Sequence, residues 1–274
     1  MPRIDAILEQ LARDPAAPLD IAEVALQLAR DEYPQLDIEG YLSELNALAH
    51  EAKNYARGNF TARVDGLCRY LFHELGFRGN KKSYYDPRNS YFNQVLDRRT
   101  GIPITLAAVM MALGQRVGVR VVGIGLPGHF VVQCQGGAQD ILIDPFHGGR
   151  RLTLTDCAHL VRQATGVPFD AAHAELPVIP LALIVQRMLN NLKGIYLQAE
   201  DWSRAIRVLD RLRQLQPHDI QHRRDLGVCL ARHGQPGKAI DHLQTYLQSV
   251  PEAEDAATIQ QVLLAATRDV ARWN

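Results

Sequence analysis

Residues 126–149 read Leu-Pro-Gly-His-Phe-Val-Val-Gln-Cys-Gln-Gly-Gly-Ala-Gln-Asp-Ile-Leu-Ile-Asp-Pro-Phe-His-Gly-Gly, two apolar runs with a pair of glycines between them. A glycine pair between apolar runs is typical of a β-hairpin turn. With Gly136-Gly137 as the turn, His129 lies directly opposite Asp144. Residues opposite each other share a face of the sheet, with Cβ atoms about 5 Å apart. The pattern therefore predicts an antiparallel sheet that holds a hydrogen-bonded His–Asp pair, which either belongs to a nucleophilic site or is an ion pair that closes the hairpin.

Both faces of this hairpin are expected to be apolar. Val131 and Leu142 share the face of the His–Asp pair and would shelter it from water. The opposite face carries Phe130, Val132, Ile141 and Ile143.

An apolar helix is predicted immediately before the sheet. Gly101-Ile-Pro-Ile-Thr leads into an apolar run that continues to about Val117. Pro103 suits the first helical position, where its missing N–H would be unpaired in any case. Gly118 ends the helix, and Val119–Leu126 is predicted as a buried strand, so the order is helix, strand, strand, strand.

The stretches on either side are predicted to be helical. Before residue 80, apolar residues recur at helical spacing, with Asp20 as an N-cap and Gly76 as a stop. After residue 180, a 34-residue period aligns Leu192 with Leu226, Ala205 with Ala239, Leu209 with Leu243, and Pro217 with Pro251. These residue types at these offsets match the paired helices of tetratricopeptide repeats.

The predicted fold class is α+β, in three parts. Residues 1–79 form a helical N-terminal layer, residues 80–180 a core with a small antiparallel sheet, and residues 181–274 helical repeats.

Composition narrows the classes of function. The chain has 274 residues, 47% of them hydrophobic, with 30 basic and 30 acidic side chains. A formal net charge of zero makes nucleic-acid binding an unfavoured function, because phosphate affinity comes from Lys and Arg. No apolar run reaches the roughly 18 residues of a membrane helix, and no secretory signal is evident at the start. The four cysteines show no metal-binding spacing, which favours reduced thiols in the cytoplasm.

Several motifs resemble one family, the bacterial SirB-type transglutaminase-like proteins with C-terminal tetratricopeptide repeats. The motifs are Gly101-Ile-Pro-Ile-Thr-Leu-Ala, Gly118-Val, Leu126-Pro-Gly-His-Phe-Val-Val and Ile143-Asp-Pro-Phe-His-Gly-Gly, with Tyr85-Asp-Pro-Arg-Asn-Ser and Leu96-Asp-Arg-Arg upstream. The resemblance implies a papain-like core in which a helix N-terminus supplies a cysteine and two strands supply His and Asp. His129 and Asp144 match the last two, whereas the cysteine position falls on Pro103.

Proline has no nucleophilic side chain, so ordinary cysteine chemistry is not expected. The main prediction is a degenerate transglutaminase-like protein that binds a protein or peptide, or regulates one, through its core groove and its repeats. The alternative is a hydrolase or acyl transferase acting on amide bonds, in which His129 is the base, Asp144 orients it, and a relocated nucleophile or an activated water attacks.

Two residues are candidates for the relocated nucleophile. Thr105 lies in the first helical turn, where a hydroxyl commonly caps the helix instead. Cys68 lies on an earlier helix among apolar neighbours, a pattern that also fits a buried thiol.

Other residues are candidates for binding. A groove is expected to include Asn89, Asn93, Arg99, Pro103 and Phe146. Helix capping and salt bridges are the alternative roles for the polar members.

Metal and cofactor chemistry is not expected. His129, Asp144 and His147 could approach a metal, but no fourth ligand is visible. The basic pairs Lys81-Lys82, Arg98-Arg99 and Arg150-Arg151 are expected to be scattered solvated charge rather than one patch.

Overall fold

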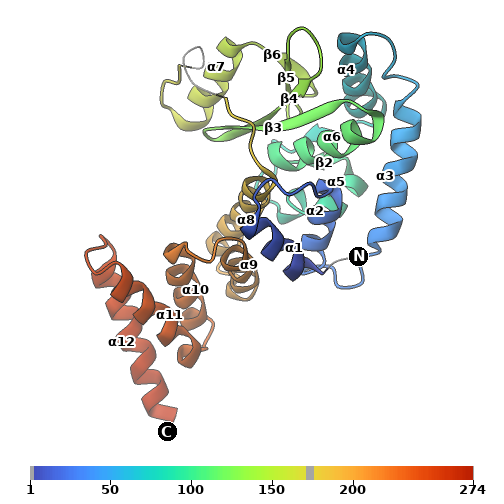
Figure 1. Cartoon of the computed structure of the whole chain (residues 1–274). Helices are drawn as coiled ribbons and strands as arrows, with labels where there is room; N and C mark the ends of the chain where they lie inside the picture. The colour runs from blue at the N-terminus through green and yellow to red at the C-terminus, as the bar shows by residue number, and fades with distance from the viewer. Residues whose placement is uncertain (1–2, 171–175, 274) are drawn as a thin grey trace. The chain divides into compact units, whose positions relative to one another are not determined.

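Two units make up the structure, a computed structural model that describes residues 3–170 and 176–273 (Figure 1). One unit comprises Ala16–Met188. The other combines Met1–Pro15 with Leu189–Asn274. The first helix of the chain thus belongs with the C-terminal helices, and the three-part division at residues 80 and 181 stays a prediction.

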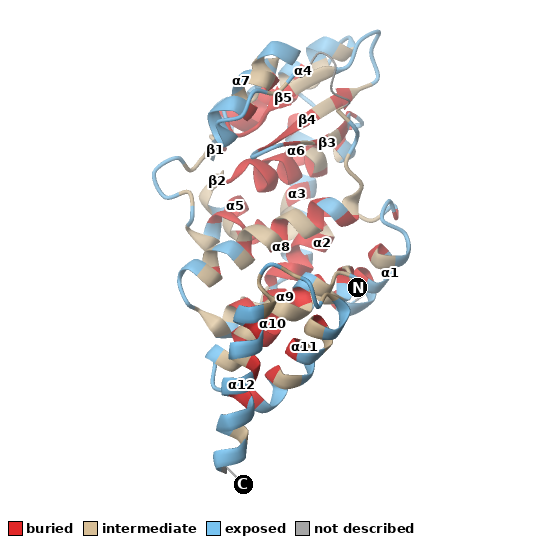
Figure 2. Cartoon of the chain, turned by 90° about the vertical axis from the view of Figure 1, so that its left-hand side faces the viewer, coloured by how far each residue is buried: buried red, intermediate tan, exposed pale blue. Residues whose placement is uncertain are grey.

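The unit Ala16–Met188 is built around helix α6 (Pro103–Val117). Pro103 occupies the first helical position after the N-cap Ile102, and Gly118 ends the helix in the left-handed conformation with φ 74°. Twelve of its 15 residues are buried, so nearly its whole circumference lies inside the core (Figure 2). A helix that is apolar on all sides is stable only when other elements surround it.

A four-stranded antiparallel sheet lies against α6, in the order β3-β4-β5-β6. Its strands are β3 (Arg120–Leu126), β4 (His129–Gln135), β5 (Ile141–Asp144) and β6 (Arg150–Leu152). Phe130, Val132 and Ile143 pack into the core around α6. Val131 and Ile124 instead pack on the other face, with Cys157 and Val161 of α7 (Leu154–Thr165). The predicted assignment of these side chains to the two faces of the sheet is confirmed.

The predicted register of the β4–β5 hairpin was wrong by two residues. Val132 pairs with Ile143 and Cys134 with Ile141, so the connection is longer than a two-residue Gly136-Gly137 turn. A shift of two residues leaves every side chain on its original face, because the side-chain period of a strand is two. For this reason His129 and Asp144 still meet.

The end of the sheet was missed by the sequence analysis. β6 follows Asp144-Pro145, and α7 begins at a capping box in which Thr153 and Asp156 exchange hydrogen bonds. β6 is only three residues long and carries two arginines, so it lacks the apolar alternation from which a strand is recognised.

Further helices, turns and strands belong to this unit besides the first part of α8 (Leu181–Gln198). They are α2 (Ile21–Ala29), α3 (Ile38–Ala52), α4 (Phe60–Cys68), the π-helical turn η1 (Arg69–Glu74), the 3-10 turn η2 (Pro87–Asn89) and α5 (Phe92–Arg98). The two-residue strands β1 (Arg78–Gly79) and β2 (Thr100–Gly101) pair in parallel. Asp20 caps α2 as predicted.

The other unit is entirely helical. Its elements are α1 (Ile4–Arg13), the later part of α8 (Leu181–Gln198), α9 (Trp202–Leu215), α10 (Ile220–Arg232), α11 (Pro236–Ser249) and α12 (Ala256–Trp273). Asp201 and Asp219 cap α9 and α10. In the 34-residue alignment Gly227 corresponds to Lys193, and a Cβ on Gly227 would lie 2.7 Å from Cδ2 of Leu243. Helices α10 and α11 therefore approach closely at a glycine.

We expect Gly227→Ala to destabilise the helical unit by about 1–3 kcal/mol, because the added methyl overpacks the contact with Leu243. Gly194 is the matched control: it lies exposed in α8, and a Cβ there meets nothing within 4 Å. Gly194→Ala should stabilise the unit by about 0.5–1 kcal/mol through helix propensity. Urea unfolding followed by circular dichroism measures both, and equal effects of the two substitutions would contradict the close α10–α11 contact.

Candidate functional site

His129 and Asp144 form the hydrogen-bonded pair that the sequence predicts. Nε2 of His129, at the first residue of β4, lies 3.0 Å from Oδ2 of Asp144, at the last residue of β5. Asp144 is fully buried and His129 is 9% exposed. With Asp144 ionised, Nε2 carries the proton and donates it to the carboxylate, so Nδ1 is the free acceptor. Among the described residues, none makes a hydrogen bond with Nδ1.

Asp144 accepts three further hydrogen bonds. Nδ1 of His147 lies 2.7 Å from Oδ2, and the backbone N–H groups of Phe146 and His147 donate to Oδ1 at 3.0 and 3.2 Å. Burial opposes ionisation of the carboxyl, but hydrogen bonds from the two imidazoles outweigh it and hold the pKa of Asp144 below its usual range. The carboxylate is therefore a fixed anion that orients both rings.

The hydrogen bond between His147 and Asp144 was not predicted from the sequence. Three ligand-type atoms of His129, Asp144 and His147 lie within 4.8 Å of one another. Zn²⁺ ligands lie about 2.0–2.2 Å from the ion. Here both ring nitrogens lie at hydrogen-bond distance from one carboxylate oxygen, so the hydrogen bonds account for the arrangement, and we assign no metal to it.

Aromatic side chains surround the His–Asp pair. The Phe146 ring lies edge-on to the rings of His129 and Tyr84, with centroids 6.1 and 6.0 Å apart. Tyr85 contacts Tyr84 and is 67% exposed. A Cβ on Gly79 would lie 2.5 Å from Cδ2 of Phe146, so only glycine leaves room for this ring. Phe146 therefore packs between His129 and Tyr84, and its predicted place in a binding groove stays a prediction.

Pro103 lies at the N-terminus of α6 and is buried. It has neither a nucleophilic atom nor a backbone N–H. Thr105, two residues later, is fully buried: its hydroxyl donates to the carbonyl of Asn89 at 2.7 Å and accepts from the N–H of Ile102 at 3.1 Å. Thr105 therefore caps the helix and connects it to η2. A buried, hydrogen-bonded hydroxyl does not favour the prediction that Thr105 is a nucleophile.

The four cysteines are free and buried. Burial raises the pKa of Cys68 and Cys134 to about 12, and that of Cys157 and Cys229 to about 11. Cys68 lies beside Gly149 and shares the α6 core with Cys134. The reactive form of a cysteine is the thiolate, and the raised pKa keeps Cys68 protonated. Cys68 is therefore a residue of the core, which does not favour the prediction that it is a nucleophile.

The two asparagines that were predicted to line a binding groove, Asn89 and Asn93, are buried. Asn89 is fully buried; its amide N–H groups donate to the carbonyls of Ser83 and Tyr84, and its Oδ1 accepts from Asn80. Asn93 is 2% exposed. Asn89 therefore shapes the loop that carries Tyr84, and the burial of both asparagines does not favour the binding role predicted for them.

The arginines of the predicted basic pairs face carboxylates. Arg99 lies in the left-handed region with φ 52°; it pairs with Glu44 at 3.3 Å and stacks on Phe77 at 4.9 Å. The other three form ion pairs, Arg98 with Asp86, Arg150 with Asp156, and Arg151 with Asp65. Local neutralisation of this kind leaves no shared basic patch among these four side chains.

Arg187 of α8 belongs to the site and was missed by the sequence analysis. Its Nη2 donates to the carbonyl of His129 at 2.9 Å and to that of Leu126 at 3.3 Å, and its guanidinium lies 5.2 Å from the Phe130 ring centroid. Burial lowers the pKa of Arg187. No carboxylate of the described residues forms an ion pair with it. No local sequence pattern predicts that Arg187, 58 positions after His129, donates a hydrogen bond to the turn between β3 and β4.

No helix within residues 3–170 and 176–273 is long and apolar enough to cross a lipid bilayer.

Comparison with known families agrees with this architecture. A family described as the transglutaminase-like superfamily matches residues 39–190, and a tetratricopeptide repeat family matches residues 192–264. The α+β fold class, the transglutaminase-like core and the C-terminal repeats are therefore confirmed. Tetratricopeptide repeats commonly mediate contacts between proteins, and this combination of parts is that of a protein-interaction module.

Individual relatives extend the similarity over most of the chain. A UPF0162 protein of Xylella fastidiosa (strain Temecula1) is 35% identical over 251 residues, 88% of each chain. A UPF0162 protein of Vibrio cholerae is 28% identical over 254 residues, 92% of this chain and 94% of the relative. F-box only protein 21 of Homo sapiens is 34% identical over 140 residues, 48% of this chain and 21% of that protein. The chain belongs to the transglutaminase-like superfamily and to the UPF0162 proteins.

Proposed function

We propose that this protein is a degenerate transglutaminase-like module of the SirB type that binds a protein or peptide and regulates it without covalent chemistry. The core groove beside His129 holds one segment of the partner, and the repeats hold another. The observation that carries this proposal is an oriented His129–Asp144 pair without a reactive thiol: Pro103 begins α6, where the family resemblance would place the cysteine, and all four thiols are buried with raised pKa values.

The groups beside His129 suit polypeptide recognition. Nδ1 of His129 is a free acceptor, and a row of ring contacts leads from the buried Phe146 through the half-buried Tyr84 to the exposed Tyr85. Exposed aromatic residues with adjacent polar groups are typical of the centres of binding surfaces. The four free, buried cysteines fit a reducing compartment, and we place the protein in the cytoplasm.

A hydrolase acting on amide bonds is the second candidate. The observation that favours it is the free Nδ1 on an imidazole whose Nε2 is tied to a buried carboxylate, the arrangement of a general base that activates water. Amide turnover that is present in the wild-type protein and lost in a folded His129→Ala variant would establish this candidate over the binding module.

The thiols are expected to be unreactive. Iodoacetamide should label the native protein more slowly than an unfolded control between pH 5 and 8, because each thiol is buried and its pKa lies well above the usual value of about 8.5. His129→Ala should label at the same rate as the wild type. Mass spectrometry locates the labelled residues, and rapid labelling of one cysteine at low pH that requires His129 would overturn the non-catalytic assignment.

Photo-crosslinking tests the groove directly. p-Benzoylphenylalanine at Tyr85, which is 67% exposed beside the His129 site, should crosslink a partner in cells of the source species. The same probe at Leu264 of α12, 47% exposed, tests the repeats, and at Val167, 61% exposed, it is the matched control. Equal crosslinking at position 85 and position 167 would argue against a groove that binds a partner.

Removal of the carboxylate is expected to weaken the fold in a pH-dependent way. Asp144→Asn should lower the free energy of unfolding by about 1–3 kcal/mol near neutral pH, because it leaves buried donors unpaired. The folded-state pKa of Asp144 lies below its unfolded value, so its contribution is complete above about pH 4 and is lost as the pH falls through the lower folded-state value.

Urea unfolding of the wild type and the variant at several pH values between 3 and 7 measures this difference. Asp140→Asn is the control, an exposed carboxylate just before the same strand. A deficit of Asp144→Asn that is constant across this pH range, or is matched by Asp140→Asn, would show that the Asp144 cluster contributes no specific stability.

A further inference from the structure

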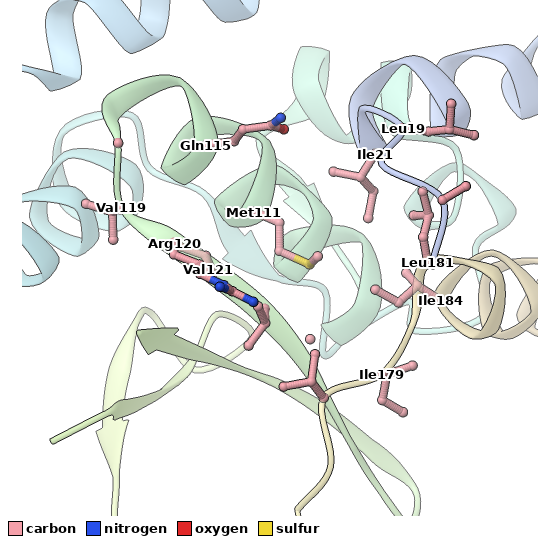
Figure 3. Close-up of a pocket in the computed structure, with 15 residues that line it drawn as sticks. Leu19, Ile21, Met111, Gln115, Val119, Arg120, Val121, Ile179, Leu181 and Ile184 are labelled. Carbon is pink, nitrogen blue, oxygen red and sulfur yellow. The ribbon is translucent and has the colours of Figure 1, made fainter. Parts of the chain in front are cut away.

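A cavity lies at the other end of β3 from the His129 site, within the unit Ala16–Met188 (Figure 3). Its volume is about 450 Å³, in the range of small-molecule sites. Leu19, Ile21, Met111 and Ile184 form an apolar wall, and these four residues come from three separate segments of the chain. The wall therefore offers a hydrocarbon group an apolar surface to pack against.

Two polar side chains of this cavity can donate hydrogen bonds to a ligand. Both polar side chains are exposed: Arg120 projects from β3, and Gln115 projects from α6 on the side of Ile21 (Figure 3). Arg120 forms no ion pair with any of the described residues. The lining contains no aspartate or glutamate. A cation without a counter-ion beside an apolar wall is complementary to a ligand that carries a negative charge at one end.

The backbone of β3 adds a third donor. Gly123 accepts a hydrogen bond from the N–H of Ile179 at 2.9 Å on the edge of β3 that faces away from β4. Backbone groups of a strand alternate in direction, so the N–H of Val121 points to the same edge. None of the described residues accepts a hydrogen bond from it. This N–H therefore remains available to an acceptor on a ligand.

We propose that this cavity binds a small amphipathic carboxylate. The carboxylate is held by the Arg120 guanidinium, with Gln115 and the Val121 N–H as further donors, and its hydrocarbon chain lies against Leu19, Ile21 and Met111. This site is separate from the His129 site, and it does not depend on the function proposed for that site.

Octanoate is the probe, and the Met111 methyl group is the reporter. In full-length protein labelled with ¹³C-methyl methionine, octanoate should shift the Met111 resonance in a saturable way. Met110, the neighbouring residue, is fully buried in the core and is the internal control. Octanamide, which has the same chain and no charge, should bind more weakly.

Three variants locate the charge and the cavity. Arg120→Gln should raise the Kd for octanoate by about five- to tenfold, since a charge-assisted hydrogen bond is lost, and leave the Kd for octanamide unchanged. Arg78→Gln removes an exposed arginine outside the cavity and should bind octanoate as the wild type does. Leu19→Glu, which introduces a carboxylate into the wall, should abolish the Met111 shift.

The proposal is overturned if octanoate leaves the Met111 resonance unmoved, or if octanoate and octanamide bind equally well. An unchanged Kd in Arg120→Gln overturns it as well. A Met111 shift that follows protein concentration instead of octanoate would identify a second copy of the chain as the occupant, and would also overturn it.

Discussion

A buried carboxylate, Asp144, connects the parts of the candidate site. Four hydrogen bonds converge on it, from the rings of His129 and His147 and from two backbone N–H groups of the loop that follows β5. An ionised carboxyl with no exposure to solvent is stable only when its oxygens are fully hydrogen-bonded. The start of β4, the end of β5 and the loop after it must therefore keep one geometry. The free Nδ1 of His129 is a consequence of that geometry.

The scaffold that holds this cluster is the contact between α6 and the sheet. The helix is buried on nearly all sides, and its N-terminus is tied to η2 through the Thr105 hydroxyl. In a nucleophilic enzyme with this arrangement the helix start would carry the attacking group. Here Pro103 begins the helix and supplies none. Asp144 orients the imidazole of His129, and the side chain at the start of α6 offers that imidazole no group to activate. This contrast is the reason to propose binding in place of turnover.

Functional groups occur at both ends of β3. Arg187 holds the turn between β3 and β4, beside the aromatic residues of the His129 site. Arg120 lies at the opposite end of the strand, over an apolar cavity. Both guanidinium groups lack a carboxylate partner among the described residues, whereas the four arginines of the pairs Arg98-Arg99 and Arg150-Arg151 each have one. An arginine without a carboxylate partner indicates where an anionic group of a ligand could bind. The net charge of the chain, which is zero, gives no such indication.

Local patterns in the sequence were sufficient for much of the architecture. The glycine pair between two apolar runs predicted the sheet, Pro103 and Gly118 marked the ends of α6, and the 34-residue period predicted the helical repeats. These features depend on neighbours within one turn, hairpin or repeat, where backbone preference and side-chain period act directly. The same periodicity brought His129 and Asp144 to one face, although the register was shifted by two residues.

Tertiary packing decided what each side chain does. It buried Asn89, Thr105 and Cys68, which from sequence alone were candidates for binding or nucleophilic attack, and it raised the pKa of the thiol by removing it from water. It also brought Arg187 to the His129 turn across 58 positions of sequence. The amino-acid sequence by itself determined the elements and the residue types available to the site. Only the three-dimensional structure decided which of them face a ligand, because burial and long-range hydrogen bonds depend on contacts between segments far apart in the chain.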